Sequence, residues 1–158
     1  MPTAMHIAAV VAVHEHLLPS ARALREAVAG KAEQWAGVVK IGRTHLKVAV
    51  PLTVGQEWSG YAAQLAQAIG RAETASSGLY ELAAGGTAVG TGLNAQPGFG
   101  AAIAEQIAAQ TGYPFVTPAS KFAAQGGLDA MVAAAAGLRG LAVALMKIAN
   151  DIRWLASG

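Results

Sequence analysis

The chain of 158 residues contains no cysteine, and both charged and aromatic side chains are scarce. Without cysteine the chain has no disulfide framework, no thiolate nucleophile and no sulfur ligand for a metal, which is typical of a cytoplasmic protein. Charged residues make up 13% of the chain, whereas soluble domains average about 25%. One interpretation is an ordinary alanine-rich helical domain. The other, which we favour, is that apolar helix faces are buried between subunits.

Basic residues are scattered along the chain, which has a formal net charge of +2. No cluster of lysine and arginine alternates with aromatic residues, so the pattern excludes a nucleic-acid interface. Residues 7–13 form an apolar run, but no basic residue precedes it and it is too short to cross a bilayer. Later apolar stretches are interrupted by Arg139, Lys147 and Asp151. We therefore predict no signal peptide, no membrane segment and a cytoplasmic location.

Apolar residues recur at helical spacing through most of the chain, which predicts an all-α fold. The predicted elements are a helix over residues 3–35 interrupted at Pro19, an extended segment over 38–50, and helices over 53–84, 97–110 and 128–156. The last of these would span about 42 Å, longer than a globule of this size is wide. We therefore expect a single domain over residues 1–158, built as a long-helix bundle that other copies of the chain complete.

Two local spacings predict specific contacts. Thr53 precedes the second predicted helix and Gln56 follows three residues later, as in a capping box. Lys147 and Asp151 are four residues apart on the last helix, so we expect them to form an ion pair.

Several segments resemble nucleotide-binding or serine-hydrolase motifs but lack the flanking strands or residues that those motifs require. The glycine-rich segment 85–94 contains Gly-Thr-Gly, but no predicted strand precedes it and no Gly-Lys-Ser/Thr ending follows. This excludes a dinucleotide fingerprint and a phosphate-binding loop. Ser59 and Ser76 lie in no Gly-x-Ser-x-Gly elbow, so nothing identifies a serine hydrolase.

The histidines of the first helix do not predict a metal site. His14 and His16 are two residues apart and face different directions on a helix, and no His-Glu-x-x-His motif is present. We expect them to be solvated. His6 lies on an apolar face, where a structural role is the usual one. We predict no metal and no cofactor.

Residues 40–46, with the sequence Lys-Ile-Gly-Arg-Thr-His-Leu, interrupt the helical periodicity. Here Arg43, Thr44 and His45 place a guanidinium, a hydroxyl and an imidazole side by side, which suits an anionic small molecule. On chemistry alone the cluster is either a binding site or incidental.

The same residues carry a family resemblance. Residues 40–46 resemble a conserved segment of the class II fumarases, in the fumarase/aspartase superfamily, and Pro-Leu-Thr-Val-Gly-Gln-Glu at 51–57 continues the match. The matching runs are residues 2–8, 40–46, 51–57, 59–61, 85–94, 114–117, 121–122 and 145–158. They extend over almost the whole chain.

The resemblance implies reversible hydration of fumarate to malate without a metal, in a homotetramer with a central helical bundle. Each active site would be assembled from segments of three subunits. Thr44 would hold a carboxylate of the dicarboxylate substrate, and His45 would act as the catalytic acid/base or proton relay. We add Arg43 and Lys47 as expected substrate-binding residues because both are cationic.

The chain also departs from the family pattern. It begins where a Ser-Ser-Asn-Asp segment should have ended and stops before a Gly-Ser-Ser-x-Met-Pro-x-Lys-x-Asn loop, so it resembles the central domain alone. Next to His45, the residues Lys47, Val48 and Val50 occupy positions where the family usually has Gln, Asp and Thr.

Three functions are compatible with these observations. The first is a fumarase-like hydratase segment that is inactive in that reaction unaided. The second is a non-catalytic oligomerisation core. The third is a repurposed site in which Thr44, His45 and Lys47 act on another substrate, such as an ester.

Overall fold

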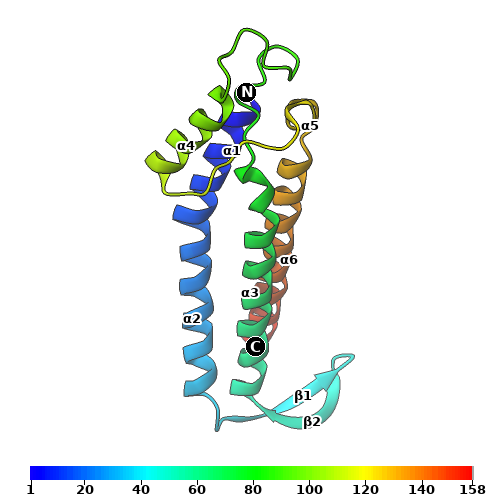
Figure 1. Ribbon diagram of the computed structural model, residues 1–158. Coiled ribbons are helices and arrows are strands. Elements are labelled where there is room, and N and C mark those ends of the chain that lie inside the picture. Colours follow the sequence, from blue (N-terminus) through cyan, green and yellow to red (C-terminus); the bar gives the residue numbers. More distant parts are fainter. Residues whose placement is uncertain (158) are drawn as a thin grey trace. The chain divides into compact units, whose positions relative to one another are not determined.

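The computed structural model describes residues 1–157 (Figure 1). The elements, in order, are α1 (Pro2–Ala12), a π-helical turn (Val13–Leu17), α2 (Leu18–Gln34), β1 (Val39–Thr44), β2 (Lys47–Thr53), α3 (Val54–Ala75), a 3-10 turn (Ser77–Tyr80), α4 (Phe99–Thr111), α5 (Lys121–Gly126) and α6 (Asp129–Leu155). The predicted all-α class is confirmed. Within the described residues, the single sheet is the antiparallel hairpin of β1 and β2.

The fold divides into two compact units. Unit 1 contains residues 1–17 and 72–138, and unit 2 contains residues 18–71 and 139–158. Helices α3 and α6 each contribute residues to both units. The predicted candidate residues of the hairpin all belong to unit 2.

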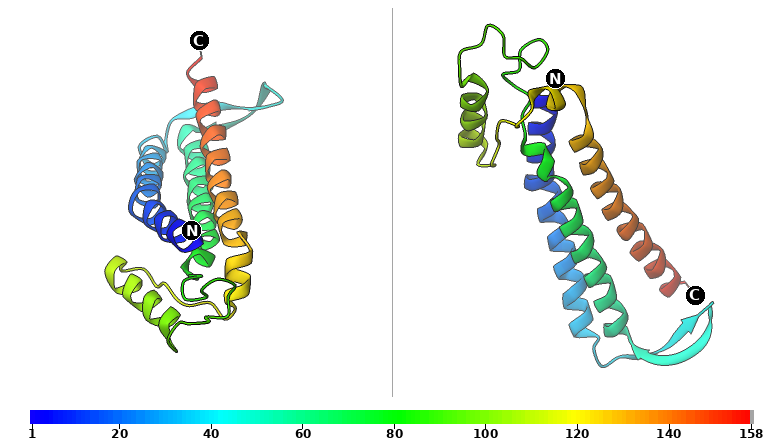
Figure 2. Two further views of the ribbon diagram at one scale, coloured as in Figure 1. Left: turned by 90° about the horizontal axis from the view of Figure 1, so that it is seen from above. Right: turned by 45° about the vertical axis from the view of Figure 1, so that its right-hand side comes forward.

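Unit 1 packs α1, α4 and the start of α6 around a small apolar core. Its buried residues are Val10, Leu79, Leu82, Ala104, Phe115 and Ala134. Helix α4 lies beside α1, where Ile107 packs against this core (Figure 2). The backbone of Leu82 donates a 2.9 Å hydrogen bond to the carbonyl of Val116, which ties the segment after the 3-10 turn to the loop that follows α4.

Unit 2 packs α2, α3 and the second half of α6 side by side (Figure 1). Its buried core residues are Val28, Tyr61, Leu65 and Ile148, one or two from each helix. Near the hairpin, the indole rings of Trp35 and Trp58 meet edge to face with their centroids 4.9 Å apart. This unit therefore supplies three packed helices as the base of the hairpin.

The predicted interruption at Pro19 is confirmed, and its form is a π turn over Val13–Leu17. Proline has no N–H to donate and its ring clashes with the carbonyl four residues earlier. A wider turn just before Pro19 accommodates both effects, so helix continues into α2.

One predicted helix boundary was wrong, and one short helix was not predicted. Helix α3 ends at Ala75 rather than continuing to residue 84. The Ser76 hydroxyl donates a 2.8 Å bond to the carbonyl of Ala72, and Gly78 follows in a tight 3-10 turn. Helix α5, in a region predicted as loop, begins where the hydroxyl of Ser120 accepts a 3.2 Å bond from the N–H of Ala123. Capping side chains of this kind determine where a helix begins, and the spacing of apolar residues does not show them.

Helix α6 is long and apolar enough to cross a membrane by length and composition. The central helix of a soluble bundle meets the same criteria, so the two measures do not distinguish these settings. Arg139, Lys147 and Asp151 all lie on this helix, and Lys147 is paired with Asp151 at 2.6 Å as predicted.

Candidate functional site

The Thr44–His45 pair lies at the tip of the β1–β2 hairpin. Thr44 pairs with Lys47 across the strands, so His45 and Leu46 are the whole two-residue turn. Both turn residues have positive φ, 51° for His45 and 62° for Leu46. Two-residue hairpins favour this conformation, but glycine and asparagine adopt it far more readily than histidine or leucine. The turn therefore places an imidazole on a strained, exposed backbone.

A β-bulge lies between the base of the hairpin and its tip. Ile41 pairs with Pro51, whereas Arg43 pairs with Val48, so β2 contains one more residue than β1 over this stretch. Gly42 lies at this irregularity, where a Cβ would come within 2.5 Å of the carbonyl oxygen of Val50. Only glycine fits at that position without moving the opposite strand.

The hairpin assigns the four predicted site residues to definite positions. Thr44 and Lys47 are direct cross-strand partners, so their side chains share one face of the hairpin. Arg43 is the adjacent strand residue and belongs to the other face. Its Nη1 atom donates a 3.3 Å bond to the carbonyl of Leu46. One donor of this guanidinium thus closes the turn that carries His45.

A cavity of about 570 Å³ lies beside the hairpin within unit 2. Its charged lining residues are Lys40, Arg43 and Glu57, and its apolar lining includes Leu46 and Trp154. Of the predicted site residues, Arg43 alone appears among the described residues that line it. Neighbouring β1 residues from Lys40 to Arg43 line the cavity, so it follows the strand, and Thr44, His45 and Lys47 lie outside its lining.

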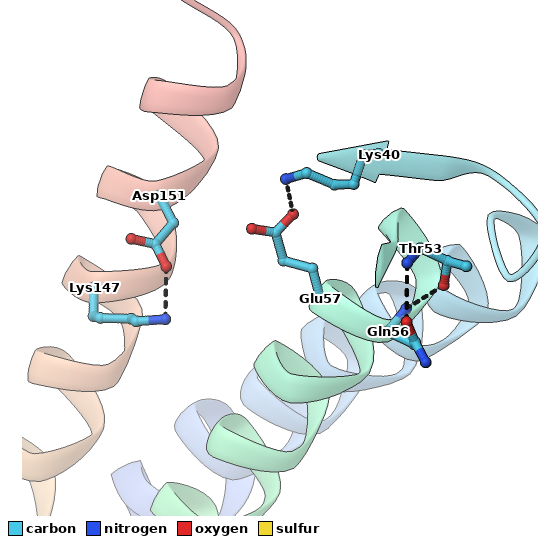
Figure 3. Close-up of polar contacts among 6 residues, drawn as sticks. All are labelled: Lys40, Thr53, Gln56, Glu57, Lys147 and Asp151. Carbon is cyan, nitrogen blue, oxygen red and sulfur yellow. Dashed lines mark hydrogen bonds and ion pairs between the residues drawn. The ribbon is translucent and has the colours of Figure 1, made fainter. Parts of the chain in front are cut away.

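Figure 3 shows two ion pairs of unit 2, one between β1 and α3 and the other within α6. The Nζ atom of Lys40 on β1 lies 2.5 Å from Oε2 of Glu57 on α3, and both side chains are partly buried. Burial raises the pKa of the Tyr61 hydroxyl, and the nearby carboxylates of Glu57 and Asp151 raise it further. Lys147 pairs with Asp151, and its Nζ atom lies 4.9 Å from the centre of the Tyr61 ring.

Lys40 and Glu57 were not predicted as partners because 17 residues separate them and a bulged hairpin brings them together. The contact between Glu57 and Tyr61 did have a sequence signal. The two residues are four apart on α3, the spacing at which helical side chains meet.

Two histidines of unit 1 make structural contacts. His6 is buried, and its Nδ1 atom donates a 2.9 Å bond to the carbonyl of Glu81, as its apolar surroundings predicted. His14 is not simply solvated: its Nε2 atom lies 3.1 Å from the Tyr80 hydroxyl and its ring packs 5.2 Å from that of Tyr113. Within residues 1–157, no group of three histidine, aspartate or glutamate side chains could hold a metal ion.

A partly buried lysine holds the backbone just before the glycine-rich segment 85–94. The Nζ atom of Lys121 donates to the carbonyls of Leu82 and Ala84, at 2.8 and 2.5 Å. Burial lowers the pKa of this ammonium group. These two hydrogen bonds anchor the backbone that leads into the segment.

A family model described as "Lyase" matches residues 1–158. The chain belongs to this lyase family, the fumarase/aspartase superfamily. Within it, the chain is similar to the class II fumarate hydratases. It is 60% identical to the enzyme of that name from Methanosarcina acetivorans and 55% identical to that from Neisseria meningitidis, each over 99% of the chain. The resemblance found in the sequence is thus confirmed.

Solved structures lead to the same family. A class II fumarase from Schistosoma mansoni matches with a TM-score of 0.91 at 37% identity, and a fumarate lyase:delta crystallin from Brucella melitensis matches with a TM-score of 0.92 at 35%. Both matches cover 99% of this chain, and 36% and 34% of those structures. The chain likewise spans about a third of its curated relatives, 32% and 34% of the two named above.

Proposed function

We propose that this chain supplies the Thr44–His45 segment of a fumarase-type active site, which adds water reversibly to fumarate to give malate. Membership of the lyase family and likeness to class II fumarate hydratases support the reaction class. Because the chain spans about a third of those relatives, we propose that other segments complete the site and that the chain alone does not turn over fumarate.

The tip of the hairpin suits a dicarboxylate. Thr44 presents a hydroxyl and Lys47 an ammonium group on the same face, and His45 lies between them in the chain. A carboxylate accepts hydrogen bonds from both kinds of donor. Arg43 belongs to the other face and adds positive charge that attracts an anion.

Hydration of fumarate breaks one carbon–carbon π bond and forms a C–O and a C–H bond. Water gives up a proton as its oxygen attacks one alkene carbon, and the neighbouring carbon takes a proton to complete malate. Imidazole both accepts and donates protons, so His45 is suited to one of these transfers or to relaying the proton away from the site. Thr44 would hold a substrate carboxylate beside it.

The observation that carries this proposal is the strained turn. Positive φ at His45 and Leu46 costs conformational free energy for these residue types. Such strain persists where the surrounding structure and a function maintain it. A turn selected for stability alone would contain asparagine and glycine.

Active-site complementation tests the proposal. A full-length class II fumarase from a relative, inactivated by alanine at the histidine equivalent to His45, is co-expressed with this chain. We expect fumarate consumption, measured by its ultraviolet absorbance, to return only when the chain keeps His45. His16→Ala, which removes an exposed histidine from the π turn, serves as the matched control. Equal turnover with the His45→Ala chain would contradict the proposal, as would no turnover with any chain in a confirmed mixed assembly.

Exposed apolar residues on α6 favour a second role, self-association of the chain as an oligomerisation core. Val143 and Met146 are 62% and 67% exposed and line a groove of about 460 Å³ on this helix. The same groove has Arg139 near one end and Asp151 near the other. A face with apolar residues between opposite charges can pair with a second copy of itself. We propose that the helices associate in this way, in a tetramer as the resemblance implies.

A further inference from the structure

We infer that Lys40 is a positioning residue, which fixes the hairpin tip carrying Thr44 and His45 through its ion pair with Glu57. The inference rests on the proposed function, because that function makes the position of His45 matter. It adds a residue that lies on the strand before the Thr-His pair and contacts neither member of it.

Few side-chain hydrogen bonds and ion pairs join the hairpin to α3. In the hydrogen bonds and ion pairs of residues 1–157, two contacts join the strands to that helix. Thr53 and Gln56 exchange two bonds at the very base, of 2.9 and 3.0 Å. The 2.5 Å pair of Lys40 and Glu57 is the other, and it holds β1 rather than β2 (Figure 3).

A small rotation of the hairpin at the Lys40–Glu57 pair would move the distant tip by a larger distance. His45 lies five residues beyond Lys40, which is about 15 Å along an extended strand. A rotation of about 10° at the base would move the tip by about 2–3 Å, whereas productive sites need placement within about 0.5 Å. Loosening the pair would therefore displace His45 by more than proton transfer tolerates.

Glu57 is itself held in place. It lies on α3 four residues before Tyr61, the spacing at which helical side chains share one face. Tyr61 is 3% exposed and belongs to the core of unit 2. Lys40 thus binds a carboxylate on a packed helix. The pair therefore restricts the movement of β1 relative to α3.

Hydrogen–deuterium exchange of the chain tests the inference without requiring activity. In Lys40→Met we expect amides of residues 39–53 to exchange about fivefold faster. Lys40→Arg should restore slow exchange because a guanidinium also pairs with a carboxylate. Arg25→Met, which removes a cation paired with Glu26 on α2, serves as the control and should leave the hairpin unchanged. Equal hairpin exchange in Lys40→Met and the original chain would overturn the inference.

Kinetics in the complemented assembly separate positioning from substrate binding. We expect Lys40→Met to lower kcat about tenfold with KM nearly unchanged, and Lys40→Arg to recover most of it. A raised KM with unchanged kcat would assign Lys40 to substrate binding and overturn the positioning role. If the unchanged chain restores no turnover, the proposed function fails, and the exchange experiment still decides whether Lys40 fixes the hairpin.

Discussion

The ammonium group of Lys147 lies over the face of the Tyr61 ring, 4.9 Å from its centre, while the same group pairs with Asp151 at 2.6 Å. Lys147 therefore satisfies a carboxylate and covers an aromatic ring at once. Below it, the Tyr61 hydroxyl lies near two carboxylates, those of Asp151 and Glu57. A neutral phenol fits this setting, and a phenolate does not.

This arrangement predicts loss of stability at alkaline pH. Burial and the two carboxylates raise the pKa of Tyr61 in the folded state, whereas the unfolded value is about 10. The stabilising contribution is fully present below that unfolded value and is lost as pH rises towards the folded pKa, by up to about 1.4 kcal/mol per pH unit. Urea unfolding of Tyr61→Phe should show a shallower alkaline decline than the original chain. Tyr113→Phe, which removes a phenol from unit 1, is the control. An unchanged alkaline slope in Tyr61→Phe would refute this account.

Relief of strain at the turn should stabilise the hairpin. Leu46 has φ of 62° and is 79% exposed, so Leu46→Gly removes a steric cost and little packing. We expect a gain of about 1 kcal/mol, measured by chemical unfolding and by slower exchange of the hairpin amides. Val48→Gly, at an exposed position with ordinary strand backbone, should instead weaken the hairpin. A loss of stability in Leu46→Gly would show that the turn is not strained.

A single methyl group should disrupt the bulge. Gly42→Ala would place its Cβ 2.5 Å from the carbonyl oxygen of Val50, so the strands must separate. We expect about 2 kcal/mol of destabilisation, seen as loss of hairpin protection with the helical circular dichroism retained. Gly60→Ala is the matched control, because nothing lies within 4 Å of its added methyl group in α3. This control should gain about 0.5–1 kcal/mol. Equal stability of the two variants would exclude the clash.

A charge on α6 should block self-association. Met146 is 67% exposed in the groove of that helix, and Met146→Lys would bury an ammonium group in any apolar interface formed there. We expect light scattering to show smaller particles for Met146→Lys than for the original chain at equal concentration. Met5→Lys, on α1 in unit 1, should leave the mass unchanged. A monomeric original chain would contradict self-association.

Local spacing predicted local contacts, and the structure confirms them. Thr53 and Gln56 form the expected capping box, with bonds of 2.9 and 3.0 Å. Lys147 and Asp151 pair as their four-residue separation indicated. In each case the helix brings the two partners together, so their spacing in the sequence is enough to predict the contact.

Contacts between distant residues could not be predicted in this way. His14 meets Tyr80 across 66 residues, and Lys40 meets Glu57 because a bulged hairpin folds back on α3. Packing decides both contacts, and no periodicity in the sequence expresses it. The residues of the candidate site were found because four of them are neighbours in the chain. Their division between two hairpin faces depends on strand register, which the sequence pattern does not reveal.

The bulge in β2 determines which side chain Thr44 faces. If the ladder continued from the Ile41–Pro51 pair without the extra residue, Thr44 would lie opposite Val48 and the turn would contain three residues. With the bulge, Thr44 lies opposite Lys47. A one-residue change in strand length would therefore exchange an ammonium group for two methyl groups beside the threonine hydroxyl. Insertions and deletions in this short strand could thus alter ligand preference while every residue at the tip stays the same.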